Sequence, residues 1–112
     1  MGAFNTLSIG IKCSNCLKDF EGILQFKFGD VRQYHYKIGD KIKDSDHCFD
    51  HIDAIVYGTV EDKKCPHCNS INIEEFDIFI KYGLILSYSP IFDFRPYLNE
   101  YEGNYYIKNK LV

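Results

Sequence analysis

Three features of the sequence predict a mostly β fold. The apolar residues are mainly β-branched or aromatic, with nine Phe and nine Tyr, and such residues favour strands. Short apolar runs are separated by Gly-Asp pairs, which are typical of turns between strands. No long segment repeats its apolar residues with the 3.6-residue period of a helix. Because the chain has 112 residues, we expect residues 1–112 to form a single β-rich domain.

The first half of the chain is expected to contain two strands. Residues 22–28 (GILQFKF) form one apolar run, and the Gly-Asp pair at 29–30 predicts a turn. In residues 31–38 (VRQYHYKI) aromatic and apolar side chains alternate with polar ones, which indicates a half-buried strand. A second Gly-Asp pair at 39–40 leads back into an extended segment, as in a β-meander or a small barrel.

The second half is expected to contain a strand, a hairpin and a less regular tail. Residues 54–60 (AIVYGTV) are the strand. In residues 75–91 a turn at Gly83 separates two sets of alternating apolar residues, which are Phe76, Ile78, Ile80 and Tyr82, then Leu84, Leu86 and Tyr88. The tail, residues 92–112, has a turn at 102–104 and forms either a last hairpin or a short helix followed by a strand.

Two CxxC pairs, CSNC and CPHC, carry the clearest chemical signal, and 48 residues separate them. Two thiolates at this spacing reach one metal ion, and two such turns supply the four soft ligands of a tetrahedral zinc site. Four thiolates leave no open position for substrate, so the expected role of Zn2+ is structural. Simple sites of this kind have about 15–20 residues between the pairs, so a β-meander inserted here must bring the pairs together. The expected ligands are Cys13, Cys16, Cys65 and Cys68.

Other roles for the four cysteines remain open. A redox CxxC belongs near a βαβ pattern, which this sequence lacks. Disulfides are rare in a reducing cytosol, and the cysteines could also be unrelated core residues. Iron can replace zinc in a site of four sulfurs. His67, inside the second pair, is expected to be an exposed spacer rather than a ligand.

The two pairs and their flanking segments resemble the zinc-ribbon (rubredoxin-like) class, and CPHC looks like the typical second knuckle of that class. The resemblance implies a zinc ribbon whose two CxxC knuckles flank an inserted antiparallel β-meander, followed by a C-terminal β-hairpin. Many ribbons have Gly directly after each pair, where this chain has Leu17 and Asn69. Asn tolerates the left-handed conformation, whereas Leu does so less easily.

The acidic segment 44–53 (DSDHCFDHID) has three interpretations. It is a solvated loop with a buried Cys48, an acidic surface for a basic partner, or a second metal site. The metal site would use His47 and His51, whose spacing places two ligands on one helical face, with Cys48 or Asp50. A catalytic Cys48 is disfavoured, because neighbouring positions on one loop seldom give thiolate–imidazole geometry. The acidic surface would consist of Asp44, Asp46, Asp50 and Asp53.

Aromatic residues are expected mostly in the core. The surplus of Tyr also suits an interface, because Tyr offers a large contact area at a low cost in entropy, and Tyr34 and Tyr36 are the candidates there. The same rings could stack on bases, but few lysines and arginines lie nearby. The aromatic positions considered are Phe26, Phe28, Tyr34, Tyr36, Phe92, Phe94, Tyr97, Tyr101, Tyr105 and Tyr106.

The net charge and the absence of known catalytic motifs restrict the classes of function that this chain can have. The net charge is −3, and residues 19–62 hold ten acidic and five basic residues, which argues against nucleic acid as the main partner. No nucleotide-binding, protease or hydrolase motif occurs, so we expect a protein that is not an enzyme. No apolar run reaches the length of a membrane span, and no secretory signal is visible, so the expected location is the cytoplasm.

The segment LQFKFGDVRQYHYKIGDKI, together with CPHC, resembles a domain of small bacterial proteins. The chain is also similar to zinc-finger-containing immunity proteins that neutralise interbacterial nuclease toxins, in its ribbon motif, size, charge and aromatic content. This resemblance implies a protein-binding module whose partner is a basic nuclease toxin, and it assigns no binding residues. The alternative is a nucleic-acid-binding ribbon that assists transcription or translation. Its bases would be Lys12, Lys18, Lys63 and Lys64, around the knuckles.

Overall fold

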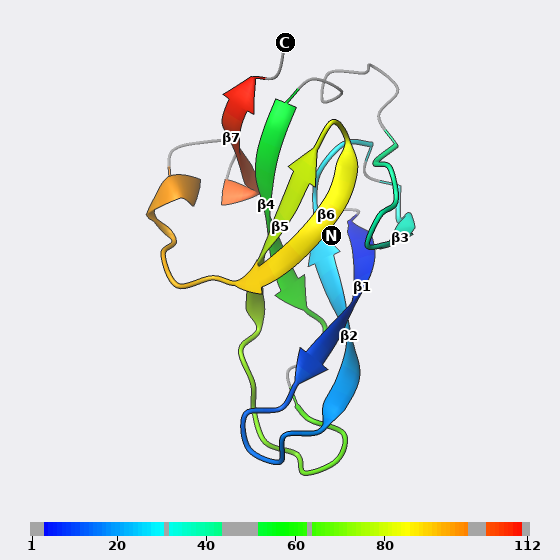
Figure 1. The fold of residues 1–112 in the computed structure, drawn as a ribbon, viewed down its shortest axis with the longest axis vertical. Helices are drawn as coiled ribbons and strands as arrows, with labels where there is room; N and C mark the ends of the chain where they lie inside the picture. Colours follow the sequence, from blue (N-terminus) through cyan, green and yellow to red (C-terminus); the bar gives the residue numbers. More distant parts are fainter. Residues whose placement is uncertain (1–3, 31, 44–51, 63, 99–102, 111–112) are drawn as a thin grey trace.

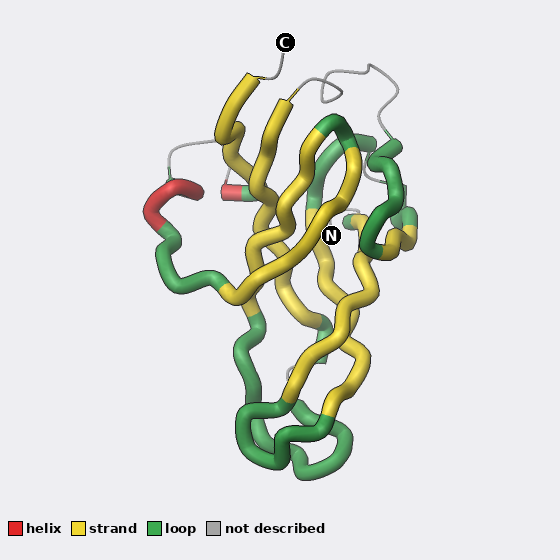
Figure 2. The backbone as a smooth tube through the Cα atoms, in the orientation of Figure 1, coloured by secondary structure: helices red, strands yellow, loops and turns green. Residues whose placement is uncertain are grey.

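The computed structural model describes residues 4–30, 32–43, 52–62, 64–98 and 103–110. These residues form strands and one short 3-10 helix, η1, with no α-helix among them (Figures 1 and 2), which confirms the mostly β class. The helical turn has neither the length nor the hydropathy of a membrane span. The elements are β1 (Asn5–Lys12), β2 (Asp19–Phe26), β3 (His35–Lys37), β4 (Ile52–Val60), β5 (Glu75–Lys81), β6 (Leu84–Pro90), η1 (Arg95–Tyr97) and β7 (Tyr105–Lys110).

The strands form one curled, mixed sheet in the order β3-β1-β2-β4-β5-β6, with β7 also paired to β4. The long strand β4 pairs with β7 through residues 52–56 and with β2 through residues 58–60. The segment after β3 reaches the far edge, where Lys41 bridges to Leu84 and the Gly39 N–H donates to the Ile85 carbonyl over 2.7 Å. This contact brings the two ends of the sheet together, so the sheet nearly closes.

The inserted segment between the knuckles is not the antiparallel meander that the sequence predicted. β4 pairs directly with β2, whereas β3 lies on the other side of β1 and is parallel to it. A parallel neighbour needs a crossover, and the described residues 27–30 and 32–34, between β2 and β3, belong to it. Only residues 35–37 of the predicted strand 31–38 pair as β3, because the residues before them belong to this crossover.

Asn5, at the start of β1, anchors the crossover. Its side chain is fully buried, and Nδ2 donates to the carbonyl oxygens of Phe28 (3.2 Å) and Asp30 (3.1 Å). Its Oδ1 accepts from the N–H groups of Arg32 (3.3 Å) and Tyr34 (3.1 Å). One amide therefore satisfies four backbone groups of an irregular segment, which explains how a polar side chain is tolerated inside the core.

The strand β1 is missing from the sequence prediction, although its pattern is regular. Leu7, Ile9 and Ile11 alternate with more exposed residues and face the interior, as in any half-buried strand. β1 pairs with β2 along its whole length, and it pairs with β3 only through residues 6–8. Beyond that point the Tyr88 hydroxyl donates to the Gly10 carbonyl (2.7 Å) and accepts from the Gly10 N–H (3.0 Å).

The β5–β6 hairpin confirms the predicted one, with a different register. Tyr82 (φ 53°) and Gly83 (φ 75°) both have positive φ, which is typical of the two-residue turns that suit the twist of a hairpin. The pairing shifts between Phe79 and Ile80. As a result Ile85 is fully buried, while Leu86 is half exposed. The prediction that Leu84, Leu86 and Tyr88 form the apolar face of the returning strand is therefore wrong.

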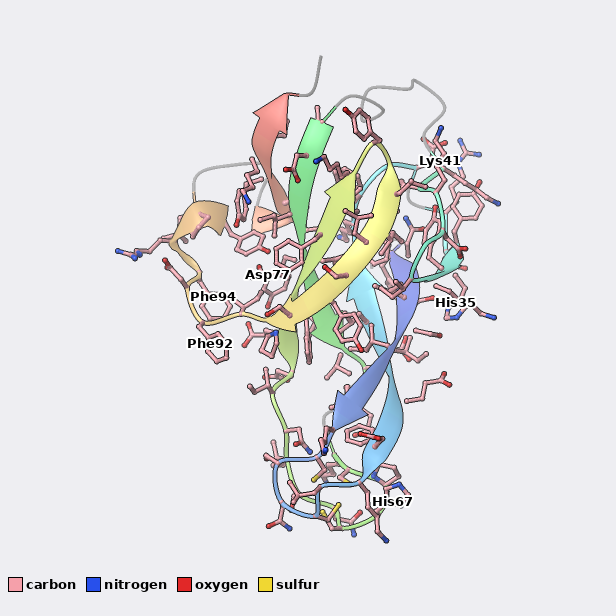
Figure 3. All side chains as sticks on the ribbon, in the orientation of Figure 1. His35, Lys41, His67, Asp77, Phe92 and Phe94 are labelled. Atoms are coloured by element: carbon pink, nitrogen blue, oxygen red, sulfur yellow. The ribbon has the colours of Figure 1, made fainter. Side chains whose placement is uncertain are left out.

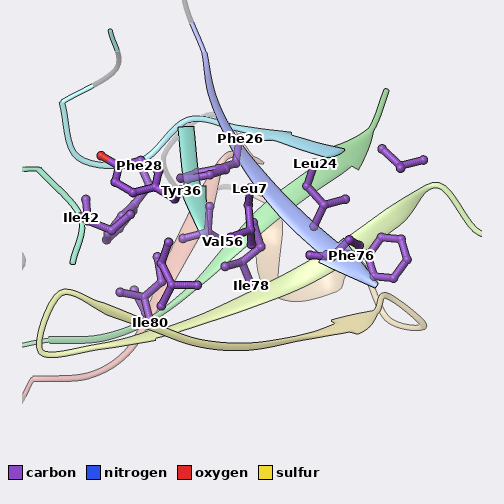
Figure 4. Packing of buried hydrophobic residues seen from close by; sticks show 14 of the residues in the cluster. Leu7, Leu24, Phe26, Phe28, Tyr36, Ile42, Val56, Phe76, Ile78 and Ile80 are labelled. Carbon is purple, nitrogen blue, oxygen red and sulfur yellow. The ribbon is translucent and has the colours of Figure 1, made fainter. Parts of the chain in front are cut away.

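The core fills the inside of the curled sheet (Figure 4). Leu7, Leu24, Val56 and Ile78 are fully buried there, and the rings of Phe26 and Tyr36 pack with their centroids 5.9 Å apart. A second cluster lies apart from this core and contains Ile55, Ile91 and Tyr97. Tyr97 belongs to η1, so the tail is a short helix followed by a strand, the second of the two predicted alternatives.

Candidate metal centre

Each cysteine pair lies at the tip of a hairpin. The first pair joins β1 to β2, and the second lies in the connection between β4 and β5. Because β2 and β4 are antiparallel neighbours, the two tips meet at one end of the long axis (Figure 1). Two hairpins side by side thus close the gap of 48 residues that separates the pairs in the sequence.

The two knuckles, residues 13–18 and 65–70, have the same backbone structure. In each, the first Cys carbonyl accepts from the N–H four residues later, and the first Cys N–H donates to the carbonyl five residues later. The bonds are Leu17 N–H to Cys13 O (3.0 Å), Cys13 N–H to Lys18 O (3.0 Å), Asn69 N–H to Cys65 O (2.8 Å) and Cys65 N–H to Ser70 O (2.9 Å).

Leu17 and Asn69 occupy equivalent positions in the two knuckles, and both are left-handed, with φ of 62° and 61°. The knuckle backbone therefore imposes this conformation on whichever residue follows the second cysteine. Asn accepts it at low cost, whereas Leu places its Cβ against the following carbonyl. Leu17 is 66% exposed, so little packing offsets this strain. The departure from glycine noted in the sequence does not prevent the first knuckle from forming.

The four sulfur atoms lie within 4.8 Å of one another. Two of the distances join sulfurs of different knuckles, at 3.6 Å for Cys13–Cys68 and 3.6 Å for Cys16–Cys65. A tetrahedral site with metal–sulfur bonds of about 2.3 Å separates its sulfurs by about 3.8 Å. The four cysteines are free thiols, and their separations are far longer than the roughly 2.05 Å of a disulfide. The group can hold a metal ion, and the cysteines are neither disulfide-bonded nor scattered through the core.

Backbone and side-chain N–H groups point at these sulfurs. The N–H of Asn15 donates to Cys13 Sγ and the N–H of His67 to Cys65 Sγ, both over 3.4 Å. Two amide side chains add to them, from Asn15 and from Asn72, which lies just beyond the second knuckle. Such donors moderate the charge of a thiolate cluster. The sequence offered no signal for Asn72, because nothing local shows that it reaches the other hairpin.

Their surroundings shift the pKa values of the Cys16 and Cys68 thiols in opposite directions. Hydrogen bonds from the Ser70 hydroxyl and N–H, then from the Asn15 amide, lower the pKa of Cys68 to about 5. A backbone hydrogen bond from Lys18 lowers the pKa of Cys16, but burial and the neighbouring sulfurs outweigh it and raise this pKa to about 11. Metal binding releases the protons that the thiols carry, so the affinity for metal increases with pH.

His67 lies outside the group of four sulfurs. Its side chain is exposed at the knuckle end (Figure 3), and its Nε2 is 3.4 Å from the Asp19 carbonyl oxygen. This is the spacer position that the sequence predicted.

The structure describes three of the predicted partner-binding residues, Tyr34, Tyr36 and Asp53. Tyr36 is buried against Phe26 and belongs to the core, which corrects its assignment to a contact surface. Tyr34 is half-buried, with the Lys43 ammonium 4.3 Å from its ring centroid, and Asp53 is half-buried on β4 opposite Lys81. The other acids and the proposed second metal ligands lie outside the described residues: Asp44, Asp46, His47, Cys48, Asp50 and His51.

A different surface carries exposed apolar residues. On the segment after β6, Phe92 is 83% exposed, Phe94 41% and Leu98 63%, so the expectation that Phe92 and Phe94 belong to the core is wrong (Figure 3). Buried Ile91 and Tyr97 hold the two ends of this segment, and we call residues 91–98 the pinned loop.

Polar contacts fix the pinned loop further. The Asp93 carboxylate accepts from the Arg95 backbone N–H (3.1 Å), Nε (2.9 Å) and Nη2 (2.9 Å). The Tyr97 hydroxyl donates to the Asp77 carboxylate on β5. The Ile91 N–H donates to the Glu75 carbonyl over 3.1 Å. The loop is therefore held by backbone, ionic and apolar contacts, while its largest apolar side chains face solvent.

Comparisons with known proteins give no relative from which to transfer a function: no protein-family model, curated protein or solved structure matches this chain.

Proposed function

We propose that this protein is a non-enzymatic protein-binding module whose fold is held by one structural zinc ion. The specific role that we propose is that of an immunity protein, which binds and neutralises a bacterial nuclease toxin. The zinc ion joins the two hairpin tips, and the rest of the domain supplies the contact surface.

The choice of zinc is supported by the ligand type and spacing. Four thiolates in a tetrahedral arrangement are typical of structural zinc, and such a site has no position left for water or substrate. Bound there, the ion would supply folding energy and no reaction chemistry. Elemental analysis of protein purified without added metal should find zinc in a one-to-one ratio to the set of four cysteines. Iron in that ratio, or metal-free folded protein, would contradict the choice.

The pinned loop is the observation that carries the protein-binding role. Aromatic residues and Arg are enriched at the centres of protein interfaces, and this loop presents Phe92, Phe94 and Arg95 together. Its contacts fix the backbone before a partner arrives, which lowers the entropy lost on binding. An exposed Phe side chain adds little to the folding stability of the isolated domain. Its placement is best explained by a partner that covers it.

The nuclease partner is supported by charge and by the resemblance to immunity proteins. The chain has a net charge of −3, whereas an enzyme that binds DNA or RNA needs a basic cleft. Opposite charges accelerate the encounter of two proteins and favour the correct orientation. An acidic module that covers a basic cleft would block the substrate phosphates from the nuclease.

The test combines binding and inhibition. The protein encoded next to this chain's gene should be purified, assayed for nuclease activity, and titrated with this domain. We expect tight inhibition that Phe92→Ala with Phe94→Ala weakens strongly. Ile71→Ala is the matched control, because Ile71 is 64% exposed but lies beside the second knuckle, and it should leave inhibition unchanged. Equal inhibition by all variants would contradict the role of the pinned loop.

A nucleic-acid-binding role is the second candidate, favoured by exposed lysines near the knuckles. Lys12, Lys18 and Lys64 are all exposed there, although Asp19 and Asp62 lie among them. Fluorescence anisotropy with generic DNA and RNA at low salt separates the two candidates. Binding at micromolar protein that weakens steeply with added salt would support this role over the first.

A further inference from the structure

Two asparagine amides connect each knuckle to a sulfur of the other one. Asn15, in the first knuckle, donates from Nδ2 to Cys68 Sγ over 3.6 Å. Asn72, just beyond the second knuckle, donates from Nδ2 to Cys13 Sγ, also over 3.6 Å. The two contacts are reciprocal, so each hairpin tip places a neutral donor beside a thiolate that belongs to its neighbour.

The orientation of the Asn72 amide is fixed by its other partners. Its Oδ1 accepts from the Ser14 N–H (3.0 Å) and the Ser14 hydroxyl (3.3 Å), and its Nδ2 also donates to the Ser70 carbonyl (3.2 Å). A backbone N–H can only donate, and a backbone carbonyl can only accept, so the amide cannot be turned around. The NH2 group must therefore face the sulfur of Cys13.

Four thiolates around a divalent ion carry a net negative charge, which N–H donors stabilise. Backbone donors reach Cys13 and Cys65 from within their own knuckles. The two asparagine side chains differ from these because they act between knuckles. They stabilise the charge of the cluster and also favour the approach of the two tips that brings all four sulfurs together.

We propose that Asn15 and Asn72 are positioning residues of the metal centre, which hold the sulfurs of opposite knuckles in place and increase the affinity for the ion. This inference rests on the proposed zinc site and extends it to residues that bind no metal themselves. It predicts that metal affinity depends on the direction of two amide groups as well as on the four ligands.

Aspartate variants test the proposal with a minimal change of shape. In Asn72→Asp the oxygen that accepts from Ser14 is retained, while the donor facing the sulfur becomes an anionic acceptor. Asn15→Asp makes the same exchange at an exposed position, where the substitution disturbs no core packing. The matched control is Asn69→Asp, which adds the same charge to the second knuckle at a left-handed residue that Asp also tolerates.

The first measurement is zinc affinity by competition with a chromophoric chelator. We expect each of Asn15→Asp and Asn72→Asp to weaken binding about 10- to 100-fold and Asn69→Asp to weaken it much less. The second measurement loads the wild type and variants with iron and records the reduction potential. N–H donors favour the more negative reduced state, so both variants should have lower potentials than the Asn69→Asp control.

The outcomes separate this inference from the proposed function. If the wild-type protein does not bind zinc, the zinc role and this inference are both wrong. If the wild type binds zinc but the two variants match Asn69→Asp in affinity and potential, the inference alone is overturned. A loss of affinity with an unchanged potential also overturns it, because the amides would then not stabilise the charge of the sulfurs.

Discussion

Replacing Asn5 with alanine should lower the free energy of unfolding by about 2.5–4.5 kcal/mol. The structure shows four hydrogen bonds from this side chain, one of them fully buried and three partly buried. Leaving a buried carbonyl without its donor costs about 1–3 kcal/mol, and each partly buried bond contributes about 0.5 kcal/mol because water can replace it. The sum is about 2.5–4.5 kcal/mol, which is a large effect for a single substitution.

The assay is urea unfolding of both proteins at saturating zinc. Far-UV circular dichroism monitors the transition, because the chain contains no Trp for fluorescence. The control is Asn104→Ala, because Asn104 is half-buried and only its backbone carbonyl accepts a hydrogen bond from the described residues, so the substitution removes no such bond. We expect the control to change stability by less than about 0.5 kcal/mol. If Asn5→Ala costs less than about 1 kcal/mol, the crossover is not anchored by this amide and the reasoning fails.

Three further predictions concern the knuckles and the buried acid. Asn69→Leu should destabilise the fold by about 1–2 kcal/mol, because it places at the second knuckle the strain that Leu17 carries at the first; equal melting temperatures would contradict this. Removing the metal with a chelator, or replacing Cys65 with serine, should unfold the protein, since structural zinc contributes about 10–16 kcal/mol of apparent binding energy; an unchanged near-UV spectrum would contradict it. Burial raises the pKa of Asp77, so the folded state holds this proton more tightly and stability falls as pH rises through the folded pKa. Asp77→Asn should therefore gain stability relative to wild type as the pH rises above about 4, the ordinary pKa of an Asp carboxyl group; paired urea midpoints measure this gain, and a difference that does not change with pH would argue against it.

The sequence was sufficient for features that depend on local pattern. The four ligands follow from spacing within each pair, and the β5–β6 hairpin follows from alternation around Gly83. The strand β1 was also predictable, because Leu7, Ile9 and Ile11 alternate as clearly as the residues of any other strand.

Features that depend on distant partners could not be predicted. The parallel pairing of β3 is set by Asn5, whose partners lie 23 to 29 positions away in the sequence. The exposure of Phe92 follows from Ile91 and Tyr97, which occupy the apolar cluster in its place, and composition cannot distinguish among these neighbours. The direction of the Asn72 amide is likewise decided by a serine on another hairpin.

The hydroxyl of Tyr88 has a consequence for how this protein behaves at high concentration. Among the described residues, the edge of β1 that faces away from β2 has no partner strand after Ser8, so the backbone on that side can template another chain. Tyr88 engages both the N–H and the carbonyl of Gly10, the two groups that an incoming strand would need first. A single phenol thus blocks this open edge of the nearly closed sheet. Removing it in Tyr88→Phe should leave the monomer folded but increase its tendency to assemble into fibrils.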